Sequence, residues 1–270
     1  MLRAAVLGSP IKHSLSPTLH RAAYRFLGLD WDYTAIECTA GQFPAFFADL
    51  DEQWRGLSLT MPLKEVVLEV VEDVDALARE VHSANTVYRE NARAAWRATN
   101  TDIEGMARAL QEAGVSSIYS GLILGAGATA RSAVAALVRL GVRRVVIHAR
   151  RLDAAQAVAD LAEGLGLQAS AADLTPVGVD CDVVVSTLPA DAAAPWAEVI
   201  GASPHAALLD ASYHPWPTPL AVARHGHPGA LVASGRDMLI WQAVVQVRLM
   251  TGVDFDDVEL AQVMESALGK

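Results

Sequence analysis

The stretch Gly121-Leu-Ile-Leu-Gly125-Ala-Gly127-Ala-Thr-Ala130 decides the fold. It reads as a short apolar strand, a tight glycine turn and the start of a helix, which is the layout of a dinucleotide-binding βαβ unit. Gly125 permits the turn, Gly127 lets the backbone approach a pyrophosphate, and the helix N-terminus offers N–H groups to it. More than a hundred residues precede this motif. We therefore expect an oxidoreductase whose substrate-binding part comes first.

The composition indicates a two-domain protein that binds small molecules. The chain has 270 residues, of which 52% are hydrophobic, so each of two domains can bury a core. An excess of 31 acidic over 21 basic residues gives a net charge of −10. This charge argues against a nucleic acid or an anionic membrane as the main partner. No run approaches the roughly 18 apolar residues of a membrane-spanning helix.

Cysteine and histidine usage indicates a cytoplasmic protein without a metal site. Cys38 and Cys181 lie far apart and outside any CxxC motif, so we expect two small hydrophobic side chains in a reducing compartment. The N-terminus passes directly into an apolar, strand-like run over residues 2–7 rather than into a signal peptide. The eight histidines show no metal-ligand spacing such as HExxH.

Downstream of the glycine turn, apolar strands alternate with helical patterns, which predicts a doubly wound parallel sheet. Residues 130–138 place alanines and valines at helical spacing, and Gly141 ends that helix. A second, alanine-rich helix is predicted over 153–165. The strands predicted after the turn are 144–148, 167–170, 182–186, 206–210 and 230–234.

The first hundred residues alternate in the same way, so the N-terminal part is also predicted to be α/β. The predicted strands are 4–8, 33–38 and 56–61, with a hairpin of 86–88 and 94–98, and the predicted helices are 17–27, 42–50, 64–71 and 75–81. Helices over 103–113 and 238–251 complete the pattern. We expect a substrate domain over 1–102, joined by C-terminal helices in 237–270, and a Rossmann-like cofactor domain over 103–236. The active site is expected in the cleft between the two.

The residues after the second cofactor strand favour NADP over NAD. Dinucleotide sites that prefer NAD usually carry an acidic residue about 20 positions after the glycines, whereas an arginine there indicates the 2′-phosphate of NADP. Here the strand ends in His148-Ala149-Arg150-Arg151, with no acidic residue at its tip. Guanidinium groups match phosphate geometry and also stack on adenine. The alternative is two solvated arginines in a surface turn, and Asp153 lies slightly further on.

Two polar clusters of the N-terminal half carry candidate chemistry. Ser14 and Ser16 lie two residues apart before Pro17, where a hydroxyl either caps the helix or holds a carboxylate. Further on, a strand ends in a proline turn that presents Thr60 and Lys64. A lysine after such a turn is usually solvated, but one that faces a dry pocket is able to move protons.

The other two clusters, Ser83-Ala-Asn-Thr86 and Thr99-Asn-Thr-Asp102, consist of residues that are ordinary in turns. Both precede the cofactor part. A charge pair of Lys64 and Asp102 would serve the conversion of a hydroxyl to a ketone, in which the lysine acts on the proton while a nicotinamide takes the hydride.

The whole chain resembles the shikimate dehydrogenase family. The motifs that carry the resemblance keep their order over nearly all 270 residues: Gly8-Ser-Pro-Ile-Lys-His-Ser-Leu-Ser-Pro17, Thr60-Met-Pro-Leu-Lys64, Ser83-Ala-Asn-Thr86, Asn100-Thr-Asp102, Gly125-Ala-Gly-Ala128, Ser186-Thr-Leu-Pro189, Asp210-Ala-Ser-Tyr213, Thr218-Pro-Leu220 and Gly235-Arg-Asp-Met-Leu-Ile-Trp-Gln242. The resemblance implies NADP-linked interconversion of shikimate and 3-dehydroshikimate, a step of aromatic amino-acid biosynthesis, by a monomer or a homodimer.

The resemblance also implies a role for individual residues. Lys64 transfers the proton and pairs with Asp102. The implied substrate-binding residues are Ser14 and Ser16 for the carboxylate, Thr60, Asn85, Asp102 and Gln242 for the ring hydroxyls, and Tyr213 in the pocket wall. The implied cofactor-binding residues are Gly125, Ala126, Gly127 and Ala128 for the pyrophosphate, Arg150 and Arg151 for the 2′-phosphate, and Thr187, Leu188, Ala211, Gly235 and Met238 beside the nicotinamide.

The chain departs from the family pattern at a few positions. Ser58 stands where the family usually has Asn, and Ala128 replaces the second glycine of a pair. Ala149-Arg150-Arg151 stands where the family has Asn-Arg-Thr, which indicates a changed phosphate clamp. Two alternatives follow: a quinate/shikimate dehydrogenase that prefers NAD, and a non-catalytic NADP-binding sensor. The two serines and the two arginines favour shikimate and NADP, and the presence of Lys64 and Asp102 favours an enzyme.

Overall fold

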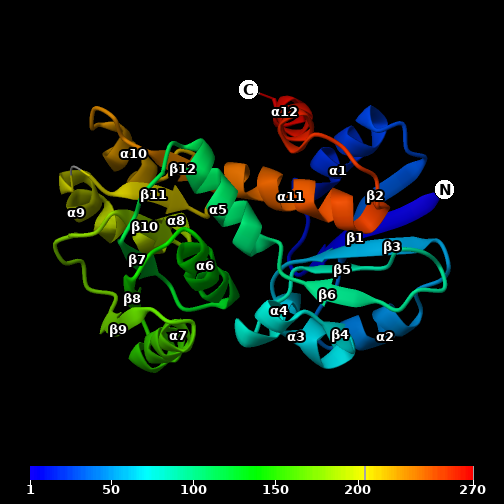
Figure 1. The fold of residues 1–270 in the computed structure, drawn as a ribbon, viewed down its shortest axis with the longest axis horizontal. Helices are drawn as coiled ribbons and strands as arrows, with labels where there is room; N and C mark the ends of the chain where they lie inside the picture. Colours follow the sequence, from blue (N-terminus) through cyan, green and yellow to red (C-terminus); the bar gives the residue numbers. More distant parts are fainter. Residues whose placement is uncertain (204, 270) are drawn as a thin grey trace. The chain divides into compact units, whose positions relative to one another are not determined.

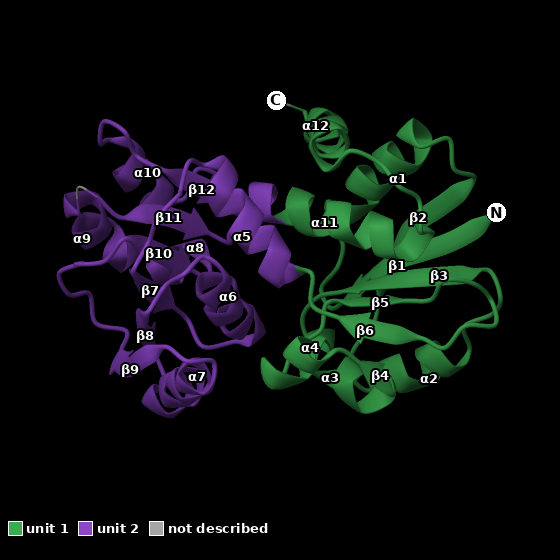
Figure 2. Cartoon of the chain, viewed as in Figure 1, with its two compact units in different colours: residues 1–101, 239–270 green, residues 102–238 purple. Residues whose placement is uncertain are grey.

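The computed structural model describes residues 1–203 and 205–269, and the chain forms two compact units (Figure 2). Unit 1 comprises Met1–Thr101 and Leu239–Lys270, and unit 2 comprises Asp102–Met238. Each unit has its own six-stranded sheet with helices on both faces. The chain passes from unit 1 to unit 2 at Thr101–Asp102 and returns within the long helix α11 (Gly235–Thr251).

The sheet of unit 2 is a doubly wound parallel sheet with strand order β12-β11-β10-β7-β8-β9, in which each of these neighbouring strands pairs in parallel. Its strands are β7 (Ser120–Leu124), β8 (Arg144–Ala149), β9 (Gln168–Asp173), β10 (Val183–Ser186), β11 (Ala207–Asp210) and β12 (Val232–Ser234). The first strand, β7, lies between β8 and β10, so the strand order reverses there. Ligands of such sheets bind at the carboxyl ends of the strands beside this reversal.

Helices cover both faces of that sheet (Figure 1). One group contains α5 (Asp102–Glu112), α6 (Ala128–Arg139) and α7 (Leu152–Gly164), and the other contains α8 (Ala190–Ala193), the 3₁₀ turn η1 (Ala194–Trp196), α9 (Ala197–Ala202) and α10 (Pro219–His225). In α6 the buried face is made of apolar side chains such as Ala130, Ala133 and Leu137, as the spacing predicts. Gly141 follows α6 with a φ of 90°, which suits glycine at that position.

The sheet of unit 1 has the order β2-β1-β3-β5-β6-β4 and is mixed. Its strands are β1 (Leu2–Gly8), β2 (Trp31–Glu37), β3 (Trp54–Leu59), β4 (Asp73–Val74), β5 (Thr86–Tyr88) and β6 (Arg97–Thr99). The strands β2, β1 and β3 run parallel, and β5 is antiparallel to both β3 and β6. The second hairpin strand is therefore residues 97–99 rather than the predicted 94–98, because Ala94 N bonds to Asn91 O in a turn.

Six helices accompany this sheet, namely α1 (Ser16–Phe26), α2 (Phe43–Ala48), α3 (Leu63–Val70), α4 (Ala76–Glu80), most of α11, and α12 (Asp257–Ala267). Figure 1 shows α2, α3 and α4 on one side of the sheet and α1, α11 and α12 on the other. The core on the α3 side contains Leu57, Leu59, Leu63 and Val67, which are at most 3% exposed. Among the described residues, no helix is long and apolar enough to cross a membrane.

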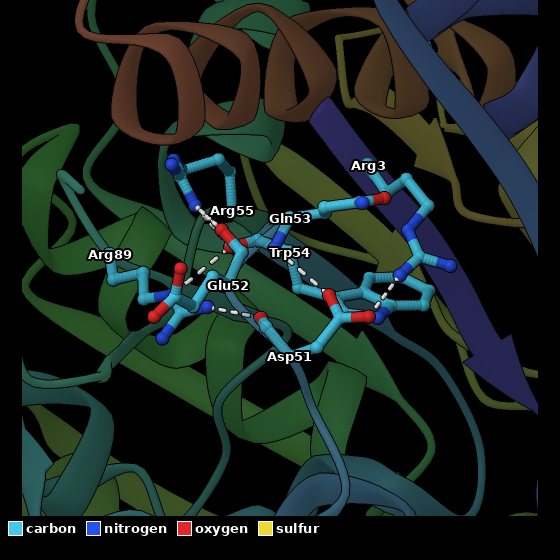
Figure 3. Close-up of polar contacts among 7 residues, drawn as sticks. All are labelled: Arg3, Asp51, Glu52, Gln53, Trp54, Arg55 and Arg89. Carbon is cyan, nitrogen blue, oxygen red and sulfur yellow. Dashed lines mark hydrogen bonds and ion pairs between the residues drawn. The ribbon is translucent and has the colours of Figure 1, made fainter. Parts of the chain in front are cut away.

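A cluster of arginines and backbone carbonyls closes the loop before β3 (Figure 3). The Arg89 guanidinium donates to Asp51 O at 2.5 Å, to Trp54 O at 3.0 Å and to Ala92 O at 3.2 Å, and it lies over the Trp96 ring. Arg3 forms an ion pair with Asp51 at the same loop. These contacts fix the start of β3, the strand that leads to the turn with Thr60 and Lys64.

Candidate functional site

The glycine turn of unit 2 lies at the strand-order reversal between β7 and β10. Gly125 has a φ of 113°, and a Cβ there would lie 2.3 Å from Thr187 Oγ1 and 3.4 Å from Leu188 Cδ2. Glycine is therefore required for both backbone conformation and space. By contrast, a Cβ on Gly127 would meet no atom within 4 Å. Open space beside the N-terminus of α6, which starts at Ala128, fits a pyrophosphate.

A second close approach brings Ala211 and Gly235 together at the neighbouring strand ends. Ala211 N donates to Ser186 O at 2.9 Å, and a Cβ on Gly235 would lie 2.2 Å from Ala211 O. Gly235 opens α11, and Met238 is 7% exposed one turn further on. The structure thus gathers Gly125, Thr187 and Leu188 in one group and Ala211 with Gly235 in another, along one edge of the sheet.

The start of α11 is held by a reciprocal cap. Ser234 N and Ser234 Oγ both donate to the Asp237 carboxylate, at 2.7 Å and 2.8 Å, and Asp237 N donates back to Ser234 Oγ at 3.2 Å. This is a capping box with aspartate in the third helical position. Within the Gly235–Gln242 motif, Asp237 therefore has a structural role, which is to stabilise the N-terminus of α11.

The end of β8 separates a buried histidine from two exposed arginines. His148 is 5% exposed, its Nδ1 lies 2.6 Å from Asp173 O, and its backbone oxygen accepts from Gly125 N at 2.8 Å. Arg150 and Arg151 follow immediately and are exposed. Because His148 O binds Gly125 N, the arginines leave the sheet next to the glycine turn. That is where a 2′-phosphate would require them.

In unit 1, the loop with the two serines is tied to β2 by a carboxylate. Glu37 accepts from Ser9 Oγ at 2.6 Å and from Ile11 N at 3.1 Å. Ser14 is partly exposed, while Ser16 is 4% exposed and is the first residue of α1. The alternative of a serine N-cap is not what the structure shows, because Leu15 is the N-cap residue and makes no side-chain cap. Ser14 Oγ accepts only a long bond of 3.4 Å from Ser16 N.

The turn with Thr60 and Lys64 is fixed by its backbone. Thr60 N donates to Leu7 O at 2.9 Å, and a Cβ on Gly8 would lie 2.3 Å from Thr60 Cγ2, so only glycine fits beside Thr60. Lys64 is the second residue of α3 and is half-buried. Its carbonyl accepts from Ala84 N at 2.8 Å. The structure thus places Lys64 beside the segment that carries Asn85.

Asn85, Thr101 and Gln242 form a buried cluster. Thr101 N donates to Asn85 Oδ1 at 2.7 Å, and Asn85 Nδ2 donates to Gln242 Oε1 at 3.2 Å. Thr101 Oγ1 lies 3.3 Å from the same Gln242 oxygen. All three side chains are at most 5% exposed. Asn85 and Gln242, 157 positions apart in sequence, therefore meet, so two of the four side chains predicted to bind the ring hydroxyls lie together.

Asp102 and Tyr213 belong to unit 2. Asp102 follows Thr101 directly, begins α5 and is 4% exposed. Tyr213 lies on the loop after β11, and burial raises the pKa of its phenol. Asp210 holds that loop, since it accepts from Ser212 N at 3.1 Å and from Thr218 Oγ1 at 2.6 Å. Burial also raises the pKa of Asp210.

Sequence reasoning missed a second buried group below Asn85. His20 is fully buried, stacks on Tyr33 at 3.9 Å between ring centroids, and lies 3.2 Å from Gln246 Oε1. Ser58 joins the same group at 2.7 Å from Gln246 Oε1. The available signal was Gln246 itself, a polar residue one helical turn after Gln242 in the helix predicted over 238–251.

The order of the parallel strands, the glycine turn at their reversal and the open space at Gly127 define unit 2 as a Rossmann-like dinucleotide-binding domain, and unit 1 is an α/β substrate-binding domain. Residues 6–87 match the family model described as the shikimate dehydrogenase substrate binding domain. The chain belongs to the shikimate dehydrogenase family.

The relatives match the chain over its full length. It is 34% identical to the shikimate dehydrogenase (NADP(+)) of an Exiguobacterium species, with 99% of each chain covered. The solved shikimate dehydrogenase of Mycobacterium tuberculosis is 41% identical with a TM-score of 0.89, covering 98% of this chain and 100% of that one. The Thermus thermophilus enzyme, solved in complex with NADP(H) and shikimate, is 29% identical with a TM-score of 0.80, covering 99% and 100%.

Proposed function

We propose that this protein is a shikimate dehydrogenase that interconverts shikimate and 3-dehydroshikimate with NADP(H). The observation that carries the proposal is the buried cluster of Asn85, Thr101 and Gln242, which offers neutral hydrogen-bonding groups from three separate segments of unit 1. Such a cluster suits a small ligand rich in hydroxyl groups. Full-length relatives that carry the name shikimate dehydrogenase (NADP(+)) support the same activity.

Lys64 is the proposed proton-transfer residue. When bound, the nicotinamide accepts the hydride that leaves the alcohol carbon, or donates it in the reverse direction. The hydroxyl proton then passes to the lysine Nζ during oxidation and returns from it during reduction. Asp102 is the proposed partner that orients Lys64 and hydrogen-bonds the substrate. Its support is the position of Thr101, the preceding residue, on the Asn85 side chain.

The substrate carboxylate is proposed to bind Ser14 and Ser16. Their support is the Glu37 anchor, which holds the loop that leads to them at Ser9 and Ile11. Thr60, Asn85, Asp102 and Gln242 are the proposed ligands of the ring hydroxyls. Tyr213 is proposed to line the pocket, supported by the partial burial of its side chain.

The proposed cofactor site uses the edge of the unit 2 sheet. Gly125, Ala126, Gly127 and Ala128 would hold the pyrophosphate, and Arg150 and Arg151 the 2′-phosphate. Thr187, Leu188, Ala211, Gly235 and Met238 would lie beside the nicotinamide. The support is the open space at Gly127 and the exposure of both arginines where the chain leaves β8 next to Gly125.

A spectrophotometric assay at about 340 nm, the band of reduced nicotinamide, tests the proposal by crossing shikimate and quinate with NADP and NAD. We expect strong activity only with shikimate and NADP. A preference for quinate or NAD would instead identify a quinate/shikimate dehydrogenase and show that Arg150 and Arg151 do not bind a 2′-phosphate. No activity in any combination would point to a non-catalytic NADP-binding protein.

Two broader properties belong to the same proposal. Cys38 and Cys181 are free thiols, which supports a cytoplasmic location. A monomer or a homodimer is expected in solution, and sedimentation equilibrium distinguishes the two.

A further inference from the structure

Gln246 is buried at the centre of a hydrogen-bonded network in unit 1. It is 1% exposed, and its Oε1 accepts from Ser58 Oγ at 2.7 Å. The same oxygen faces His20 Nε2 at 3.2 Å. Burial lowers the pKa of His20 to about 3, so the ring is neutral at neutral pH. Because a carbonyl oxygen only accepts, Nε2 carries the ring proton, and Nδ1 is left to accept from Tyr24 OH at 3.4 Å.

The nitrogen of the Gln246 amide faces the opposite way, toward Asn85. It donates to Thr86 Oγ1 at 2.8 Å and lies 3.4 Å from the backbone oxygen of Asn85. Thr86 Oγ1 in turn donates to Asn85 Oδ1 at 2.9 Å. Gln246 therefore supports Asn85 at its backbone and, through one hydroxyl, at its side chain.

The orientation of the Asn85 amide follows from these contacts. Its oxygen accepts from Thr86 Oγ1 and from the backbone N–H of Thr101, which is a donor only. Its nitrogen consequently faces Gln242 Oε1 at 3.2 Å. Gln242 then directs its own nitrogen to Leu239 O at 3.0 Å. The donors run in one direction, from His20 and Ser58 through Gln246 to Asn85 and Gln242.

Ser58 has both of its polar functions engaged in this network. Tyr33 OH donates to Ser58 Oγ at 2.6 Å, and Ser58 donates its single hydrogen to Gln246. Ser58 is 4% exposed. Ser58 is thus a support for Gln246 and offers no donor to a substrate hydroxyl.

We propose that Gln246 is a positioning residue that, with Ser58 as its donor, fixes the amides of Asn85 and Gln242 in the orientation that recognises the ring hydroxyls of the substrate. This inference rests on the proposed function, because it assigns the substrate to that cluster. Gln246 acts through Asn85 and does not itself contact substrate.

The Gln246→Met variant tests the inference, since methionine has a similar length and volume but neither donates nor accepts a strong hydrogen bond. Loss of one such support is expected to raise the KM for shikimate about tenfold. The KM for NADP should not change. The matched control is Val247→Ala, a fully buried neighbour on the same helix, which removes packing and no hydrogen bond. It should lower the thermal midpoint and leave both KM values unchanged.

A double-mutant cycle with Asn85→Ala distinguishes positioning from direct binding. If Gln246 acts through Asn85, the effect of Gln246→Met on kcat/KM for shikimate is expected to disappear in the Asn85→Ala background. Equal effects in both backgrounds would overturn the inference. Ser58→Ala should reproduce part of the increase in KM, and Ser58→Thr, which keeps the hydroxyl, should restore the wild-type value.

A measurement on the unliganded protein separates this inference from the proposed function. We expect the side-chain amide protons of Asn85 and Gln242 to exchange slowly with solvent in the wild type and in Val247→Ala, and at least about tenfold faster in Gln246→Met. Unchanged exchange rates would overturn the positioning role. If the wild type oxidises no shikimate, the proposed function is wrong, and the exchange rates still decide whether Gln246 holds the two amides.

Discussion

At the scale of single residues, the two glycines of the dinucleotide turn, Gly125 and Gly127, have different roles. Gly125 is required by the fold, because a side chain would collide with Thr187. A Cβ on Gly127 would meet only open space, so its absence serves the ligand. We expect Gly127→Ala to leave the thermal midpoint unchanged and to weaken NADP binding about tenfold or more, because a methyl group occupies the position of a pyrophosphate oxygen.

Calorimetric titration with NADP measures this effect. Gly164→Ala is the control, because Gly164 ends α7 and a Cβ there also meets nothing within 4 Å. It should bind NADP as the wild type does. Equal affinities of Gly127→Ala and the wild type would show that the pyrophosphate does not approach this backbone.

Lys64 is the residue on which turnover should depend most. We expect Lys64→Ala to lower kcat by at least about a hundredfold while the KM for shikimate changes little, because the group acts chiefly in proton transfer. Steady-state kinetics with shikimate and NADP give both constants.

The Lys64→Arg variant separates proton transfer from charge. Arginine keeps the positive charge but does not release a proton near neutral pH, so its turnover should stay low. If Lys64→Arg restores turnover, or if Lys64→Ala raises only the KM, Lys64 is a binding group rather than the proton-transfer residue.

At the scale of elements, the Arg89 cluster holds β3 in place (Figure 3). Arg89 is 7% exposed, and its guanidinium bonds to the backbone carbonyls of Asp51, Trp54 and Ala92. We expect Arg89→Ala to lower the free energy of unfolding of unit 1 by about 3 kcal/mol, since hydrogen bonds from charged groups contribute about 1.5–3 kcal/mol each and part is recovered by water. Urea unfolding followed by tryptophan fluorescence measures the change.

Arg55→Ala provides the comparison within the same cluster. Arg55 bonds to the carbonyls of Glu52 and Trp54 from a more exposed position, so its loss should cost at most about 1 kcal/mol. Equal losses for the two variants would mean that burial of the Arg89 guanidinium adds nothing to the stability of the loop.

The elements also show what sequence patterns can and cannot predict. The strands of unit 2 could be predicted from apolar runs, and the place where their order reverses could be predicted from the glycine turn. Both of these signals are local in sequence. The hairpin strand at 97–99 was misplaced because the turn at Asn91 and Ala94 has no glycine or proline to mark it. Periodicity also gives no hint of β4, whose two residues are too few to show a pattern.

The candidate site also has one part that could be predicted from the sequence and one part that could not. The family resemblance implied Asn85 and Gln242 among four ligands of the ring hydroxyls, and the structure brings these two side chains together. The support below them was not predictable, because His20, Tyr33 and Gln246 meet only through the packing of α1, β2 and α11. Contacts between residues more than 200 positions apart, such as His20 and Gln246, leave no local signal in a single sequence.

At the scale of the whole molecule, groups with shifted pKa values decide how stability depends on pH. Hydrogen bonds from Tyr119 N and Ser120 lower the pKa of Asp182. The contribution of Asp182 to the free energy of unfolding is therefore lost only when the carboxylate becomes protonated in acid. Asp210 has the opposite effect on stability. Burial raises its pKa, so the charged carboxylate lowers the free energy of unfolding. Between pH 5 and 7 the dependence that the structure defines most sharply comes from a fully buried histidine.

His20 is that histidine. Its pKa is about 3 in the folded protein and 6.5 in the unfolded chain. Between these values the unfolded chain binds one more proton than the folded protein, so the free energy of unfolding decreases as the pH is lowered across that range. From pH 7 to pH 5 the expected loss of unfolding free energy is about 2 kcal/mol, and the contribution of His20 becomes constant only well above the unfolded pKa. Hydrogen exchange of unit 1 amides in urea, at pH 7 and at pH 5, measures this loss of unfolding free energy.

His20→Gln should be less stable than the wild type at every pH, because its packing is altered. On acidification from pH 7 to pH 5, however, it should lose about 2 kcal/mol less than the wild type. His13→Gln, at an exposed position of the same unit, should keep the wild-type slope. An unchanged slope in His20→Gln would mean that the buried ring takes up its proton without opening the fold, and the neutral donor that His20 presents to Gln246 would then not persist at pH 5.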